Sequence, residues 1–106
     1  MQKLYAVKDI KLQAFGRLAQ FPNVAVAIRE FTAAIKSEQT PWSQYPSDFE
    51  VWEIGDYNDE RGILIQREEP EFIMSMEQIA QTIPGWQEHK NQINMFKGEQ
   101  NATKKN

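Results

Sequence analysis

The chain has 106 residues, a formal net charge of −3 and no cysteine. A chain of this length forms one domain and buries roughly 65% of its unfolded surface. The lack of cysteine excludes a disulfide framework and a thiolate site, and no apolar run approaches the ~20 residues of a membrane-spanning helix. We expect a single globular domain over residues 1–96 and a polar, disordered tail over residues 97–106.

Charge is unevenly distributed along the chain. Residues 1–36 hold six basic and two acidic residues, residues 37–88 hold two and twelve, and residues 89–106 hold four and one. A basic end of this kind can meet phosphate, because the field of a local patch matters more than the net charge. The same pattern also suits association between copies of the chain, or an ordinary solvated surface, and charge alone leaves these readings open.

The N-terminal part predicts a strand followed by a helix. Residues 4–7 form a short apolar run with high strand propensity. Residues 9–23 are less regular and end in a turn, where Asn23 is a plausible N-cap. From Val24 to Lys36, apolar residues recur at the i, i+3/i+4 and i+7 spacing of an amphipathic helix.

The middle of the chain predicts a β-hairpin. Two prolines follow the helix and prevent it from continuing, and residues 49–56 then alternate as a strand does. An Asn- and Asp-rich turn closes at Gly62, which supplies a positive φ, and residues 63–66 form the partner strand. Pro70 is expected to end the sheet. Large apolar residues occur on both faces of the first strand, so both faces are expected to be covered.

The C-terminal part predicts short helices. Ser75 and Gln78 have the spacing of a capping box, and the helix that follows stops at Pro84-Gly85. A second helix is predicted over residues 86–96. The fold class is therefore α+β: a small antiparallel sheet of at least three strands, packed by one amphipathic helix, with short C-terminal helices.

The sequence shows no catalytic constellation. His89 is the only histidine, and no ligand spacing around it predicts a zinc site. Glycine is too scarce for a phosphate-binding loop. Acidic residues around the hairpin turn and before Pro70 could flank a divalent ion, as in a nuclease, but a solvated acidic face is the commoner role of such runs. We expect no enzyme activity, no cofactor and no metal.

Aromatic and basic residues lie close together in a pattern typical of single-strand binders. Such proteins stack bases on aromatic rings and follow the backbone with Lys or Arg. Trp52 has an alternative role, because it could equally pack in a core or in a dimer seam. The candidate DNA-binding residues are Lys3, Tyr5, Lys8, Lys11, Arg17, Arg29, Trp52, Arg61 and Arg67.

Three segments resemble the small nonstructural protein of gokushoviruses, which are single-stranded DNA phages. They are LYAVKD, AVAIREF and PWSQYPSDFEVWEIGDYNDERG, in that order over roughly residues 3–66. The resemblance implies a non-virion, DNA-binding protein that acts in genome replication or packaging in the cytoplasm of the infected bacterium. It transfers no site residue. We therefore expect a non-enzymatic protein that binds single-stranded DNA, as a homodimer and away from membranes. The alternative is an interaction factor that binds a phage or host replication or capsid protein without touching DNA.

Overall fold

The structure is a computed structural model that describes residues 1–88. Four antiparallel strands form one sheet in the order β2-β1-β3-β4, which confirms the expected α+β class with at least three strands. The elements are β1 (Gln2–Asp9), β2 (Ala14–Phe21), α1 (Val24–Lys36), α2 (Pro41–Gln44), the 3-10 helix η1 (Pro46–Asp48), β3 (Phe49–Asn58), β4 (Ile63–Ser75) and α3 (Met76–Ala80).

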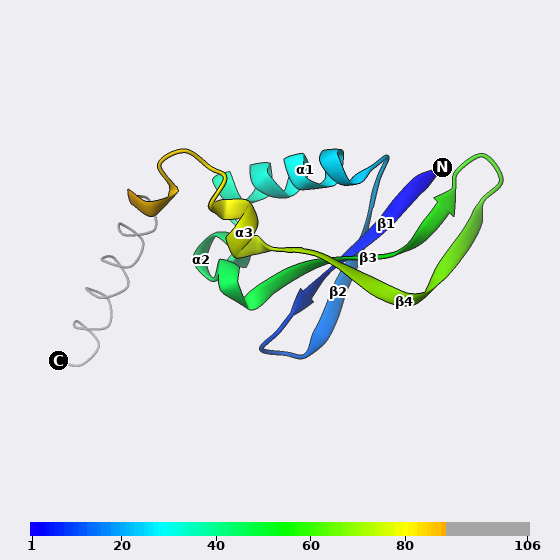
Figure 1. Cartoon of the computed structure of the whole chain (residues 1–106), viewed down its shortest axis with the longest axis horizontal. Coiled ribbons are helices and arrows are strands. Elements are labelled where there is room, and N and C mark those ends of the chain that lie inside the picture. The colour runs from blue at the N-terminus through cyan, green and yellow to red at the C-terminus, as the bar shows by residue number, and fades with distance from the viewer. Residues whose placement is uncertain (89–106) are drawn as a thin grey trace.

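The helices lie on one side of the sheet, as Figure 1 shows, with α1 running along it and α2 and α3 gathered near the end of α1. We call the sheet face toward α1 the inner face and the opposite one the outer face. The turn between β3 and β4 extends beyond the first turn of α1 (Figure 1). One end of the sheet is therefore covered by helices and the other end is not.

The core occupies the inner face under α1. Phe31 and Ile35 of α1 are buried against Tyr5 of β1 and Val51 of β3, as the apolar stripe of the helix predicts. Aromatic rings continue this contact in a tilted and edge-to-face series, with centroids 6.0 Å apart for Tyr5–Phe21 and 5.7 Å apart for Phe21–Phe31. The predicted amphipathic helix is thus the element that closes the core.

Helix boundaries follow the predicted capping chemistry. The side chain of Asn23 accepts a hydrogen bond from the Val26 amide at 2.9 Å, which caps α1. Ser75 and Gln78 form both hydrogen bonds of the predicted capping box at the start of α3. At the other end of α1, the buried hydroxyl of Ser43 donates to the carbonyl of Ile35 at 2.6 Å, which also accepts from the amide of Glu38 at 3.2 Å.

Three strand predictions need correction. β1 is longer than residues 4–7, and β2 occupies residues 14–21, where no strand was predicted. Pro70 does not end the sheet, because β4 continues through it to Ser75. Glu53 pairs with Glu71 and Gly55 with Gln66, so residues 67–70 bulge from β4 opposite a single residue of β3. The bulge lies on an edge strand, where a proline without an N–H is tolerated.

The hairpin prediction is confirmed in its turn and in its alternation. Gly62 has a φ of +69°, the positive value expected for the turn residue. Gly55 has a different role, because a Cβ there would lie 2.5 Å from the carbonyl oxygen of Ile65. The backbones of β3 and β4 approach too closely at this point for any side chain.

Several predictions fall outside the described residues. Most of the predicted helix over residues 86–96, the predicted tail over residues 97–106 and His89 lie in the undescribed part. Within residues 1–88, no helix has the length and apolarity needed to cross a membrane.

Candidate nucleic-acid interface

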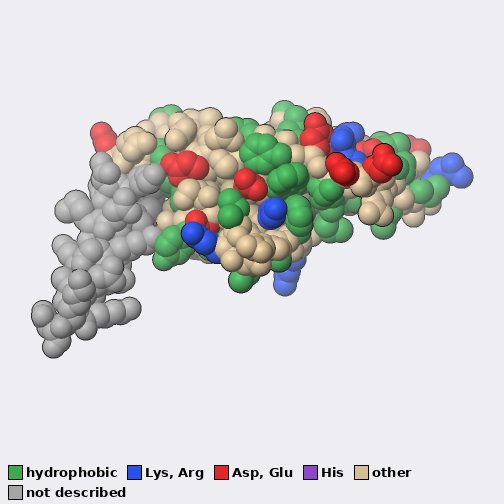
Figure 2. Space-filling view, turned by 60° about the horizontal axis from the view of Figure 1, so that its bottom comes forward, with side chains coloured by type: hydrophobic (Ala, Val, Ile, Leu, Met, Phe, Trp, Pro, Cys, Tyr) green, Lys and Arg blue, Asp and Glu red, His purple; other side chains and the backbone are tan. Residues whose placement is uncertain are grey.

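The outer face carries a row of three aromatic rings across the sheet. Phe15 of β2, Trp52 of β3 and Phe72 of β4 meet edge to face, with centroids 5.8 Å apart for the first pair and 5.6 Å for the second. Phe15 is 45% exposed and Phe72 is 44% exposed, while Trp52 is half-buried between them. Figure 2, turned toward the side away from α1, shows hydrophobic side chains gathered over the middle of the molecule with single cationic groups among them. We call these three rings the aromatic row.

The row can form because a small residue lies beneath it. Ala6 of β1 pairs directly with Trp52 on one side and with Leu18 on the other, and it lies diagonally from Phe15, which pairs with Lys8. Its side chain is only 1% exposed because the rings cover it. A larger residue at Ala6 would separate Phe15 from Trp52.

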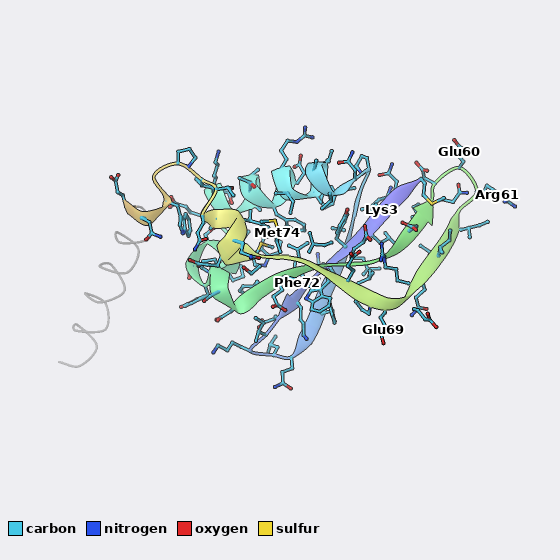
Figure 3. The ribbon with its side chains drawn as sticks, viewed as in Figure 1. Lys3, Glu60, Arg61, Glu69, Phe72 and Met74 are labelled. Carbon is cyan, nitrogen blue, oxygen red and sulfur yellow. The ribbon has the colours of Figure 1, made fainter. Side chains whose placement is uncertain are left out.

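A bulge in β4 brings Phe72 to the outer face. Trp52 pairs with Phe72 while the preceding residue, Val51, pairs with Met74, so Ile73 is the extra residue in β4. Phe72 and Met74 would share a face in a regular strand. Figure 3 shows them on opposite sides of β4, with Met74 toward α3 and Phe72 away from it.

Lys8 supplies a positive charge at the aromatic row. Its ammonium nitrogen lies 5.6 Å from the centroid of Phe15 and 5.5 Å from that of Trp52. A cation at this distance is attracted to the negative faces of the rings. Lys8 makes no ion pair within residues 1–88, so its charge can still meet an anion that approaches the rings.

Two further candidate cations lie near the same end of the sheet. Lys11 is in the turn between β1 and β2, and Arg17 is on β2 itself. Asp9 shapes the turn, because its carboxylate accepts hydrogen bonds from the amides of Lys11 at 3.0 Å and Leu12 at 3.1 Å. Neither Lys11 nor Arg17 forms an ion pair in the described part of the chain, and both side chains are exposed.

Three predicted cations are engaged with acidic neighbours instead. The ammonium group of Lys3 lies 2.9 Å from Asp56, and this hydrogen bond with its charge raises the pKa of Lys3. Arg67 pairs with the buried carboxylate of Glu53 and, at 3.1 Å, with Glu71. Arg29 lies on α1, on the other side of the sheet from the aromatic row, and is 3.6 Å from Glu30.

Tyr5 and Arg61 are also separated from the aromatic row. The side chain of Tyr5 is 0% exposed in the core, so it has no free face for a base in this structure. Its burial raises the pKa of the phenol, with the charge of Glu53 as a second cause. Arg61 sits at the tip of the hairpin, beside Glu60 (Figure 3), roughly 25–30 Å along β3 from Lys8.

Sequence reasoning found Lys8 and Trp52 but missed Phe15 and Phe72. The alternation that would have revealed Phe15 is broken by a bulge, because Gly16 and Arg17 together oppose Val7. Phe72 lies beyond Pro70, where the sheet was expected to have ended. The available signal was limited to Phe15, which stands between the small residues Ala14 and Gly16, whereas Phe72 is followed by the apolar Ile73 and Met74.

The inner face has an apolar cleft of about 410 Å³ between the β1–β2 hairpin and the helices. Val7, Phe31, Trp42 and Phe49 are among the residues that line it. Phe15 of the aromatic row and its neighbour Ala6 are also lining residues, so the cleft adjoins the β1–β2 end of the row. Within residues 1–88, no group of three or more His, Cys, Asp or Glu side chains is placed to hold a metal ion.

Comparison with known proteins gives one finding. No curated protein and no solved structure matches the chain. A family model described as Phage ORF5 protein matches residues 2–79, which include the whole sheet and nearly all of α3. The chain therefore belongs to the Phage ORF5 protein family.

Proposed function

We propose that this phage protein binds single-stranded DNA on its outer face, without enzyme activity. The observation that carries the proposal is the aromatic row, with Lys8 held over two of its rings. Bases of a duplex are already stacked on one another, so rings on a sheet surface can reach only unpaired bases. Three rings side by side match about two or three nucleotides, as on other sheet surfaces that bind single strands.

The charges around the aromatic row favour binding of the DNA backbone on one half of the outer face. Lys8 over the rings and Lys11 in the adjacent turn can contact phosphates beside the stacked bases, whereas Arg17 opposes the core-packed Val7, so the strand register turns Arg17 toward the inner face. The β4 bulge carries exposed Glu68 and Glu69, and Figure 3 shows Glu69 directed away from α1. Repulsion from these carboxylates would keep the DNA backbone on the half of the sheet that holds the row.

The phage family and the resemblance to gokushoviruses support a biological setting for the proposal. We place the protein in the cytoplasm of the infected bacterium, where the phage genome is single-stranded before its replication and during packaging. Binding through stacking and phosphate contacts is tolerant of sequence, which suits a protein that coats or delivers a whole genome.

Association of two copies through β2 completes the proposal. β2 is an edge strand with Leu18 60% exposed and Arg17 as its only charge. The other edge, β4, is interrupted by the bulge over residues 67–70 with its acidic side chains and proline. Pairing of β2 with β2 would give a closed homodimer whose aromatic rows face the same way.

A salt-dependent titration with single- and double-stranded oligonucleotides tests the function. Affinity for the single strand should exceed that for the duplex, and log affinity should fall with log salt by about 0.7 per phosphate contacted. Lys8→Gln should weaken binding. Arg29→Gln is the matched control, because it removes one charge on the far side of the sheet and should leave affinity almost unchanged.

The second candidate function is binding to a replication or capsid protein without DNA contact. The exposed acidic residues of the β3–β4 hairpin favour it, and Asp59, Glu60, Glu68 and Glu69 would form the surface. Absence of any affinity for single-stranded DNA at low salt would refute the first function and leave this one.

A further inference from the structure

A carboxylate stands beside the central ring of the aromatic row. Glu50 precedes Trp52 by two residues on β3, so both side chains lie on the outer face. The indole N–H of Trp52 donates a hydrogen bond to Oε1 of Glu50 at 3.2 Å. This bond fixes the ring orientation, but it uses only one of the two carboxylate oxygens. The other oxygen accepts no hydrogen bond within residues 1–88.

Lys8 faces Glu50 across the strands without neutralising it. The two residues are direct partners in the β1–β3 register, yet no ion pair within 4.0 Å joins them. The ammonium group lies over Phe15 and Trp52 instead. The Trp52 ring is therefore flanked by an available positive charge and by an available hydrogen-bond acceptor.

An acceptor at this position distinguishes among unpaired bases. A carboxylate accepts hydrogen bonds but donates none, so it favours a base edge that carries an amino group. Cytosine presents such a group at N4, whereas thymine presents a carbonyl oxygen at the same position. A carboxylate facing that carbonyl gains no hydrogen bond and repels it.

We propose that Glu50 selects the base stacked on Trp52, so that the protein prefers cytosine to thymine. This inference rests on the proposed function, since it needs a single strand on the outer face. It adds a specificity-determining residue to a surface that would otherwise tolerate any base. Lys8 opposite Glu50 offsets the repulsion between the carboxylate and the nearby phosphates.

The test compares oligo(dC) with oligo(dT) of equal short length at neutral pH, using fluorescence anisotropy. The unmodified protein should bind oligo(dC) about tenfold more tightly, the effect of one hydrogen bond to a charged group. Glu50→Gln should remove or reverse this ratio, because an amide can still accept from the Trp52 N–H while its NH₂ group faces the base as a donor. If Glu50 only orients the Trp52 ring, Glu50→Gln would leave the ratio of the oligo(dC) and oligo(dT) affinities unchanged, which would refute the proposal.

Glu69→Gln is the matched control. It removes the same charge from an exposed site on the β4 bulge, away from the row, so it should alter both affinities alike and keep the ratio. Equal binding of the two oligonucleotides by the unmodified protein would overturn the base preference alone. Failure of both oligonucleotides to bind would overturn the proposed function, and this inference with it.

Discussion

Replacement of Trp52 by alanine separates its packing role from a binding role. The ring makes two edge-to-face contacts, worth about 0.5–1.5 kcal/mol each, and one contact with the Lys8 cation, worth about 0.5–1 kcal/mol. Because the ring is only half-buried, its total loss should stay below the ~3–5 kcal/mol of a fully buried aromatic residue. We expect Trp52→Ala to lower the free energy of unfolding by about 2–3 kcal/mol.

The same variant should also bind single-stranded DNA more weakly, and its destabilisation alone should not account for the loss of affinity. Removal of one stacking platform costs about 1–3 kcal/mol of binding, or roughly 5- to 150-fold in Kd. Unfolding is measured by circular dichroism in urea, and binding by anisotropy under conditions where each variant is folded.

Trp42→Ala is the matched control for Trp52→Ala. Trp42 is also partly buried and contacts one aromatic ring, that of Phe31 at 5.6 Å, but it lies on the side of the helices. It should lose stability and keep its DNA affinity. Equal losses of affinity in both variants would show that the loss comes from destabilisation, and unchanged affinity in Trp52→Ala would refute the stacking role.

Three further substitutions test the description of the sheet. Tyr5→Phe should leave stability unchanged or raise it by about 1 kcal/mol, because the buried hydroxyl has no hydrogen-bond partner within residues 1–88, and it should keep DNA affinity. Since burial raises the pKa of Tyr5, the folded state favours the neutral phenol. The stability of the parent should therefore fall as pH rises above about 10. Alkaline unfolding curves of Tyr5→Phe should show a less steep fall. Arg67→Met should destabilise by about 2–4 kcal/mol in urea unfolding, because it leaves the buried carboxylate of Glu53 without its partner; a neutral result would refute the importance of this pair. Gly55→Ala should destabilise by about 1–3 kcal/mol, since its Cβ would meet the carbonyl of Ile65, and a thermal melt like that of the parent would show that the two strands can move apart.

The elements with local signals were predictable from the sequence. The apolar stripe of α1, the Asn23 cap and the capping box at Ser75 each depend on residues within one or two turns, and all three are present as expected. The turn glycine of the hairpin is equally local. Such features need no knowledge of which strands pair.

The features that depend on strand pairing were not predictable. Bulges opposite Val7 and at Ile73 interrupt the alternation of β2 and β4, so the sequence pattern gave no indication that Phe15 and Phe72 share a face with Trp52. Ion pairing across strands likewise removed Lys3 and Arg67 from the set of unpaired cations. Candidate residues that were chosen only because they are charged or aromatic therefore included some that form ion pairs or pack in the core.

Chemical-shift mapping with a short single-stranded oligonucleotide tests the central claim most directly. In ¹H–¹⁵N spectra of the labelled protein, the largest changes should fall on Lys8, Phe15, Trp52 and Phe72, including the indole N–H of Trp52. Amides on the exposed side of α1 should change little. Changes centred on α1 or on the acidic hairpin turn, or no saturable changes at low salt, would contradict a DNA-binding outer face.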